Sequence, residues 1–261
     1  MLATRSLLFN ALFYLNLVVL MIIGLPTVLF GRRAIFALAR LWGAISVWLL
    51  KTICGLRLEY RGVENIPPGA VLIAVKHQSF LETFALLKYA PDFAIILKRQ
   101  LTYVPLFGLY LIVSQQIAID RGRGRQALQQ IATAAKPVFA AGRQVFIYPE
   151  GTRRLPGAPP MYKHGVAALY AAANVRCLPV AVNTGLFWRR RGFLRRAGVA
   201  VIEYLPAIEP GLDRIAFSKR LQSTIETACD RLNAEAVGQD PSLAAVVAEG
   251  ANSERETLRP A

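Results

Sequence analysis

Residues 69–84 read GAVLIAVKHQSFLETF and join an apolar run to a polar cluster that holds one of the two histidines of the chain. The apolar run, residues 70–75, has the length and composition of a buried β-strand. His77 follows this run, Ser79 is a residue type that favours the N-cap position, and a helix would begin at Phe80. The stretch therefore predicts a strand, a turn that carries His77, and a helix.

Glu82 is the nearest acidic residue to His77, and two interpretations of the pair follow from these residues. On one continuous helix the two side chains would point ~140° apart and could not meet. If His77 lies on the turn, a carboxylate can reach one ring nitrogen, fix the tautomer and stabilise the imidazolium that forms when His77 takes a proton. Ser79-x-x-Glu82 is also a capping box, in which Glu82 bonds back to the Ser79 backbone.

From about residue 57 the chain alternates short apolar runs with helical stretches. The pattern predicts further strands at residues 93–97, 116–120, 144–148, 177–182 and 199–205. Helical spacing or good helix formers predict helices at residues 125–141, 165–173 and 213–236. This rhythm is typical of an α/β fold, here a mixed, largely buried sheet flanked by helices.

The N-terminal part of the chain is apolar enough to enter a membrane. Residues 7–30 form a 24-residue apolar run that would extend ~36 Å as one helix, and a second run covers residues 34–53. A core helix is the alternative for the first run. We expect residues 1–56 to form a membrane anchor of two apolar helices, residues 57–236 the α/β domain, and residues 237–261 a disordered tail.

Three arginines constrain how this anchor meets the bilayer. Arg32 and Arg33 separate the two apolar runs, and Arg40 interrupts the second. A full two-span hairpin would leave Arg32 and Arg33 outside and place Arg40 deep in lipid. A half-inserted hairpin avoids both problems. A single span followed by an interfacial second helix is the alternative.

The charge and cysteine content limit the partners. The chain is 54% hydrophobic and carries 31 Lys and Arg against 16 Asp and Glu, a net charge of +15, which favours an anionic membrane surface over nucleic acid. Cys54, Cys177 and Cys229 are far apart and show no CxxC spacing. They support neither a disulfide framework nor a zinc site, so we predict no metal and a reducing compartment.

A second motif, FIYPEGTRR at residues 146–154, follows another predicted strand. Gly151 lets a ligand approach the backbone, Thr152 can donate a hydroxyl hydrogen bond, and Arg153 offers a planar fork for phosphate. A surface turn closed by a salt bridge from Glu150 is the alternative. Two further segments, QIAIDRGRGRQAL and CLPVAVNTG, indicate only strands and turns by themselves.

In this order and spacing the four segments closely resemble the 1-acylglycerol-3-phosphate (lysophosphatidic acid) acyltransferases, the PlsC-like family of phospholipid synthesis, over about residues 62–185. The family's first motif is a His, four residues and an Asp, so Glu82 stands where Asp is usual, and Tyr148 stands where Phe is usual. The resemblance implies that His77 is the general base and Glu82 its orienting carboxylate. It also implies a substrate-binding set of Glu150, Gly151, Thr152, Arg153, Arg121 and Lys98.

The resemblance further implies the reaction and its setting. A fatty acyl group would pass from an acyl thioester to the sn-2 hydroxyl of lysophosphatidic acid, giving phosphatidic acid. No bound cofactor is expected, and acyl-CoA or acyl-acyl carrier protein would be the donor co-substrate. The enzyme would lie on the anionic leaflet of the inner membrane, with its catalytic domain on the cytoplasmic side and no nucleic acid as partner.

Other interpretations of the sequence remain open. They are an acyltransferase for another lyso-lipid, such as a lyso-ornithine lipid, a catalytically inactive membrane scaffold of the same fold, and a nucleic-acid-binding domain. The basic runs at residues 189–191 and 195–196 could contact either phospholipid or the acyl donor.

Overall fold

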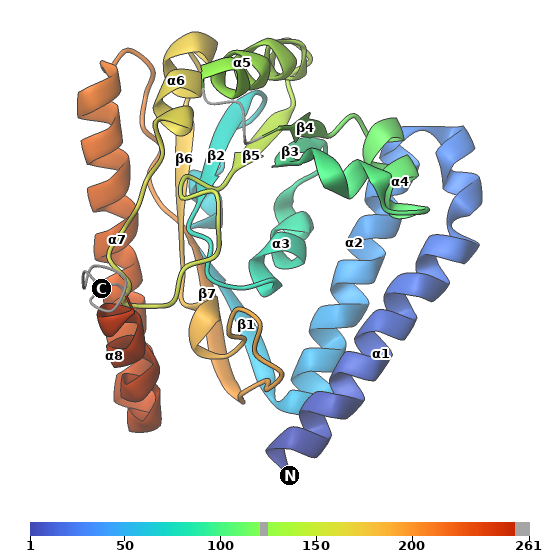
Figure 1. Ribbon diagram of the computed structural model, residues 1–261, viewed down its shortest axis with the longest axis vertical. Helices are drawn as coiled ribbons and strands as arrows, with labels where there is room; N and C mark the ends of the chain where they lie inside the picture. Colours follow the sequence, from blue (N-terminus) through green and yellow to red (C-terminus); the bar gives the residue numbers. More distant parts are fainter. Residues whose placement is uncertain (121–124, 254–261) are drawn as a thin grey trace, which may run out of the picture.

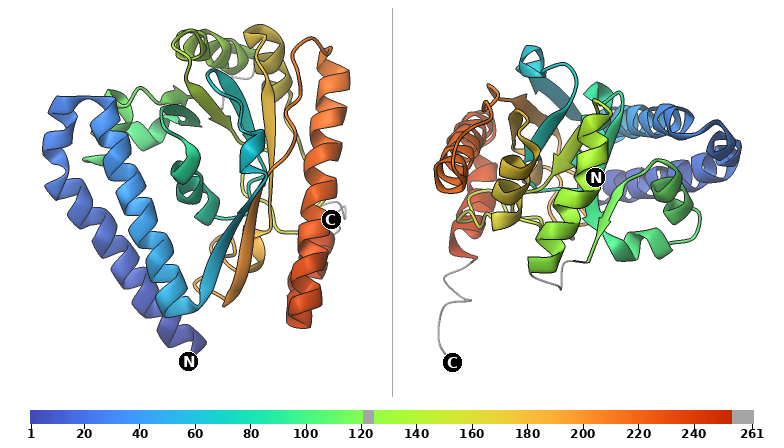
Figure 2. Two further views of the ribbon diagram at one scale, coloured as in Figure 1. Left: turned by 180° about the vertical axis from the view of Figure 1, so that it is seen from behind. Right: turned by 90° about the horizontal axis from the view of Figure 1, so that it is seen from above.

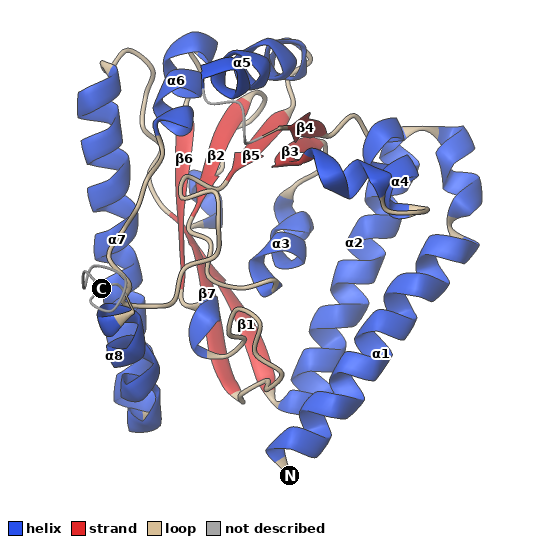
Figure 3. Cartoon of the chain, in the orientation of Figure 1, coloured by secondary structure: helices blue, strands red, loops and turns tan. Residues whose placement is uncertain are grey.

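The computed structural model describes residues 1–120 and 125–253, and its centre is a seven-stranded sheet with the order β1-β7-β6-β2-β5-β3-β4 (Figures 1 and 3). The strands are β1 (Leu56–Arg61), β2 (Val71–Val75), β3 (Phe93–Lys98), β4 (Ile117–Ile119), β5 (Gln144–Ile147), β6 (Cys177–Val182) and β7 (Gly198–Tyr204). β2 runs parallel to β5 and β6, β3 runs parallel to β5 and β4, and β7 is antiparallel to β6. The predicted mixed sheet is confirmed. Because β6, β2, β5, β3 and β4 are parallel, their carboxyl ends share one edge.

Helices cover both faces of the sheet, as the view from above shows (Figure 2). One face carries α5 (Arg125–Ala140), α6 (His164–Ala173) and α7 (Arg214–Gln239), and the other carries α3 (Leu81–Ala85), α1 (Leu2–Ile23) and α2 (Arg32–Leu49). Along β2, Val71, Ile73 and Val75 join the core on the α1–α3 face, whereas Leu72 and Ala74 join the core on the α5–α7 face. Burial on both faces explains why the strand is an unbroken apolar run.

The first helix of the N-terminal hairpin ends earlier than the predicted apolar run, residues 7–30. α1 ends at Ile23, and Pro26 lies in a 3₁₀ turn at Leu25–Phe30, because proline lacks the N–H that would continue an α-helix. α2 follows and closes with a π-helical turn at Leu50–Cys54. α1 and α2 lie side by side (Figure 1), and the segments Leu2–Ile23 and Arg32–Cys54 are long and apolar enough to cross a membrane. This composition suggests membrane association.

The hairpin and the α/β domain share one hydrophobic core. Phe9 and Phe13 of α1 and Phe36 of α2 are fully buried in the cluster that contains Phe84 of α3. A Cβ on Gly43 would lie 3.1 Å from the carbonyl oxygen of Phe84, so the glycine lets α2 approach α3 closely. The hairpin is therefore built into the domain rather than joined to it by a linker.

Two of the basic residues of the second helix contact the α/β domain. Arg32 Nε lies 3.1 Å from Asp92 Oδ2, and Arg40 Nη1 donates to the carbonyl of Pro91 at 3.2 Å. Both partners belong to the segment that leads into β3. These contacts hold the first half of α2 against the segment that precedes β3.

Two segments depart from the sequence prediction. β1 was not predicted as a strand, because the predicted strands are mostly continuous apolar runs, whereas β1 mixes apolar with charged residues and pairs only with β7 at the edge of the sheet. The prediction of a disordered tail is wrong for residues 237–253. α7 continues to Gln239, Asp240 caps a turn at Pro241–Leu243, and α8 spans Ala244–Asn252. Leu243 and Val246 are buried in the core, which explains why this segment is ordered.

Candidate active site

The site lies where the carboxyl ends of β6, β2 and β5 meet at one edge of the sheet. In open α/β sheets, ligands bind in the crevice outside this edge. His77 follows β2, and Thr184 follows β6. Residues 149–153, here called the PEGTR turn, follow β5. Side chains of a strand alternate between faces, so His77 continues the phase of Ile73 and Val75 and lies on the face that the hairpin covers.

His77 and Glu82 are in direct contact. The turn from β2 places His77 Nδ1 2.9 Å from Glu82 Oε1, because α3 begins only at Leu81, one residue later than predicted. A carboxylate can only accept, so Nδ1 carries the proton and donates it. The other ring nitrogen, Nε2, then keeps its lone pair and can act as a base. The side chain of His77 is 15% exposed, enough to meet a substrate.

Glu82 is completely buried and accepts four hydrogen bonds, one of them from His77. Oε1 also accepts from the backbone N–H groups of Gln78 at 2.8 Å and Ser79 at 2.7 Å, and Oε2 accepts from Thr184 Oγ1 at 2.7 Å. The contact with Ser79 is half of a capping box, so one carboxylate both caps the turn and orients His77. The N–H groups of Gln78 and Ser79 are therefore engaged and do not face a developing oxyanion.

Tyr148 forms one wall of the His77 site. Its ring stacks on the imidazole with centroids 4.0 Å apart and planes 25° apart. Burial and the nearby charge of Glu82 raise the pKa of Tyr148, and Arg153 opposes this rise. The phenol therefore stays neutral at physiological pH, and the guanidinium of Arg153 is close enough to act on it.

The PEGTR turn packs directly against the His77 turn. Gly151 has φ +66°, a conformation that glycine adopts without strain, and the backbone N–H of Arg154 donates to the carbonyl of His77 at 2.8 Å. Gly151 and Arg153 are half-buried and Thr152 is exposed, so this part of the turn is open to a ligand. Arg190 Nη1 donates to the carbonyl of Arg153 at 3.0 Å and supports the turn from the β6–β7 connection.

Glu150 lies beneath the turn instead of on its open side. Its side chain is buried, with Oε1 accepting from Lys76 Nζ at 3.1 Å and from the Met161 backbone N–H at 3.3 Å. The structure thus gives Glu150, expected in the substrate-binding set, the position of an internal counter-ion. A carboxylate would also repel a phosphate, so we assign Glu150 to the support of the turn.

Lys76 is the centre of a buried network that the sequence did not reveal. Lys76 lies on the same face of the sheet as Leu72 and Ala74, toward α7. There its Nζ lies 2.8 Å from Glu226 Oε1. Tyr162 donates its hydroxyl to the same oxygen at 2.9 Å. Burial alone would lower the pKa of Lys76, but Glu150 and Glu226 outweigh it and raise this pKa. Burial raises the pKa of Glu150, although Lys76 opposes the rise.

One predicted site residue, Lys98, is not joined to this group. Lys98 is exposed at the end of β3, and it continues the phase of Ala94 and Ile96, which join the core on the face opposite His77. Arg121 lies outside the described residues. Within residues 1–120 and 125–253, no cluster of three or more His, Cys, Asp or Glu could hold a metal ion.

Comparisons with known proteins agree with the motifs. Residues 57–183 match the family model described as Acyltransferase. The chain is 38% identical over 167 residues to a 1-acyl-sn-glycerol-3-phosphate acyltransferase of Pseudomonas aeruginosa, covering 64% of this chain and 65% of that protein. It is 29% identical over 200 residues to a chloroplastic 1-acyl-sn-glycerol-3-phosphate acyltransferase of Arabidopsis thaliana, covering 73% of this chain and 54% of that protein. The chain thus spans less than two thirds of the length of these relatives.

The fold is similar to the crystal structure of the 1-acyl-sn-glycerophosphate (LPA) acyltransferase PlsC from Thermotoga maritima. The TM-score is 0.73 at 20% sequence identity, and the match covers 89% of this chain and 98% of that chain. This likeness supports the observed arrangement of the fold.

Proposed function

From these similarities we propose that the chain is a member of the acyltransferase family that transfers a fatty acyl group from an acyl thioester to the sn-2 hydroxyl of lysophosphatidic acid. The product would be phosphatidic acid. The observation that carries the proposal is the contact of His77 Nδ1 with Glu82 Oε1 at 2.9 Å, beside a turn that presents Arg153. The relatives are named for the acceptor 1-acyl-sn-glycerol 3-phosphate, and we propose the same acceptor for this chain.

The proposed mechanism needs no acyl-enzyme. His77 Nε2 takes the proton of the sn-2 hydroxyl while that oxygen attacks the thioester carbonyl, and Glu82 stabilises the imidazolium that forms. The tetrahedral intermediate then expels the thiolate as its carbon–sulfur bond breaks. The leaving thiolate receives the proton from His77, so the products are the new ester and a free thiol.

The location of His77 suits a lipid acceptor. It lies on the sheet face that the apolar hairpin covers, so an acceptor embedded in a leaflet could reach it without leaving the membrane. In this proposal Gly151, Thr152 and Arg153 hold the acceptor phosphate. The donor is acyl-CoA or acyl-acyl carrier protein, and the catalytic domain lies on the cytoplasmic side of the inner membrane.

The test is an assay of the purified protein in detergent, with both donors and a set of lyso-lipid acceptors. We expect phosphatidic acid from lysophosphatidate at a higher kcat/KM than any product from lysophosphatidylcholine or a lyso-ornithine lipid. A higher kcat/KM for another lyso-lipid would replace the acceptor in the proposal. The absence of transfer to every acceptor would favour a scaffold.

Replacing Arg153 tests the phosphate contact. Arg153→Ala is expected to raise the apparent KM for lysophosphatidate about ten- to a hundred-fold, because a charge-assisted hydrogen bond contributes ~1.5–3 kcal/mol. Arg153→Lys keeps the charge but loses the planar fork, so it should recover only part of the loss. Arg176→Ala is the matched control, since Arg176 precedes β6 and so lies at the amino ends of the parallel strands, away from the site. An unchanged acceptor KM, or a rise in the donor KM alone, would remove Arg153 from the acceptor site.

Replacing Glu82 separates its two roles. Glu82→Gln can still accept from the backbone but loses the charge that stabilises the imidazolium, so kcat should fall by ~100-fold or more. Glu82→Asp keeps the carboxylate and should retain measurable turnover. Initial rates and the melting temperature of each variant provide the measurement. If Glu82→Gln turned over like the wild type at full stability, the carboxylate would serve only as a cap.

A further inference from the structure

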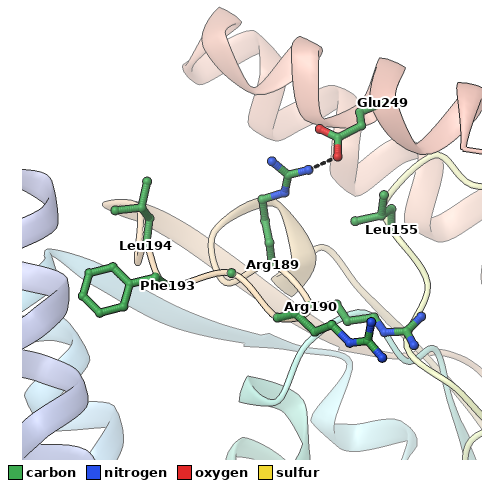
Figure 4. Close-up of a pocket in the computed structure, with 8 residues that line it drawn as sticks. Leu155, Arg189, Arg190, Phe193, Leu194 and Glu249 are labelled. Atoms are coloured by element: carbon green, nitrogen blue, oxygen red, sulfur yellow. Dashed lines mark hydrogen bonds and ion pairs between the residues drawn. The ribbon is translucent and has the colours of Figure 1, made fainter.

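The connection between β6 and β7 forms a basic and apolar loop beside the N-terminal helix. Residues 189–194 read RRRGFL, and they line a pocket of about 430 Å³ with Leu155 and Glu249. Figure 4 shows Phe193 and Leu194 on the side of the pocket that faces the N-terminal helices, Arg189 directed at Glu249, and Arg190 on the side of Leu155. The loop therefore has an apolar side and a cationic side.

Hydrogen bonds fix the apolar side of this loop to α1. Asn10 Nδ2 donates to the carbonyl of Phe193 at 3.2 Å, and the backbone N–H of Arg195 donates to Ser6 Oγ at 2.9 Å. Arg195 is itself buried, donates to Asn10 Oδ1 at 2.8 Å and stacks over Trp188 at 4.0 Å. The position of the loop relative to the helix is thus set by the fold.

The exposed apolar surface of α1 continues onto the loop. Phe193 is 49% exposed and Leu194 is 43% exposed. Leu7 precedes Asn10 by three residues and therefore lies on the same face of the helix, where it is 59% exposed. Because Asn10 contacts Phe193, the two apolar surfaces adjoin. A surface of this kind on a helix that can enter a membrane is a site for lipid.

Among the described residues that line the pocket, three arginines share a single carboxylate. Glu249 is the one carboxylate among the residues that line the pocket, and Arg189 pairs with it. Burial and the charges of Arg191, Arg153 and Arg154 lower the pKa of Arg190, as expected where like charges crowd together. An anion bound between these guanidinium groups would relieve their repulsion.

We propose that residues 189–194 are a second membrane contact, in which Phe193 and Leu194 enter the leaflet beside α1 and Arg190 and Arg191 bind the phosphates of anionic lipids. The apolar surface extends beyond the loop along α1, where Leu7 and Leu15 are also exposed, and this extent favours a bilayer over a single bound donor molecule. This contact does not depend on the acyl-transfer reaction. Because Arg190 also donates to the carbonyl of Arg153, lipid bound here would adjoin the PEGTR turn.

A fluorescent label tests the proposal without an activity measurement. The three native cysteines are buried, so Phe193→Cys provides one accessible thiol for an environment-sensitive dye. The full chain is reconstituted into vesicles of phosphatidylcholine, or of phosphatidylcholine with an equal part of phosphatidylglycerol. We expect a blue-shifted emission and quenching by a headgroup nitroxide, both stronger with phosphatidylglycerol. Ile215→Cys, an equally labelled control at the start of α7 on the opposite side of the sheet, should report water in both vesicles.

Removing the arginines tests the charge. In the labelled protein, Arg190→Gln and Arg191→Gln should each lower the ratio of inserted to aqueous label about fivefold in the anionic vesicles. The same ratio should change little in phosphatidylcholine vesicles. Arg220→Gln on α7 removes the same charge elsewhere and should have no effect. A label that stays aqueous in both vesicles would overturn the proposal. So would arginine variants that leave insertion unchanged but raise the KM for the acyl donor, since the loop would then hold the donor.

Discussion

Replacing His77 by alanine is expected to lower kcat for acyl transfer by ~10²–10⁴-fold, the usual contribution of a positioned general base. Glu82 Oε1 holds Nδ1 at 2.9 Å, so Nε2 is the ring nitrogen left to take the proton of the acceptor hydroxyl. Alanine removes that nitrogen and leaves Glu82 in place. Initial rates with lysophosphatidate and an acyl thioester, at saturating concentrations of both, measure the loss.

The fold should survive this change, which makes the rate interpretable. The imidazole is partly exposed and stacks on Tyr148, so its removal forfeits ~0.5–1.5 kcal/mol of ring contact and one hydrogen bond. Glu82 keeps its bonds to two backbone N–H groups and to Thr184. His164→Ala is the matched control, because the other histidine is exposed at the start of α6. Turnover within about tenfold of the wild type by a folded His77→Ala protein would contradict the assignment of the base.

The sequence could predict the dyad because its geometry is local. A strand that ends near Val75 and a helix that begins near Leu81 leave a short turn, and such a turn brings His77 to a carboxylate five residues later. The strands were predictable for a similar reason, since burial on both faces gives apolar runs of strand length. β1 was missed because it lies at the sheet edge, where alternating Arg and Glu side chains remain outside.

The remaining features depend on contacts that are distant in sequence. Thr184 reaches Glu82 across 102 residues and Glu226 reaches Lys76 across 150, and neither residue type marks its partner. α8 also packs against a segment that is remote in sequence, since a Cβ on Gly250 would clash with the carbonyl of Pro156. Uniform hydrophobicity also concealed that Phe9 and Phe13 of α1 are core residues, although Leu7 beside them is exposed.

Replacing Lys76 by methionine is expected to destabilise the protein by ~3–5 kcal/mol at neutral pH, because it removes the nearest cation from the buried carboxylate of Glu150. Lys76 Nζ is the group that lies between Glu150 Oε1 at 3.1 Å and Glu226 Oε1 at 2.8 Å. Glu150 is buried, so it cannot compensate by turning to water. Denaturant unfolding in detergent measures the free energy, and Lys136→Met on the exposed face of α5 is a control expected to change it by less than ~0.5 kcal/mol.

The pH dependence of the Lys76→Met variant identifies the group responsible. Burial already raises the pKa of Glu150 in the folded protein, and loss of Lys76 removes the charge that opposes this rise. A carboxyl group whose folded pKa exceeds its unfolded value binds more protons when folded, so it destabilises the fold most at pH values above the folded pKa. The loss of unfolding free energy in Lys76→Met should therefore shrink as the pH falls toward that pKa.

A second substitution, Glu150→Gln, removes the carboxylate charge at every pH. The double variant should therefore recover part of the lost stability at neutral pH. A deficit that is the same at acid and neutral pH, and that Glu150→Gln does not reduce, would mean that Lys76 acts by packing and not as the counter-ion of the turn.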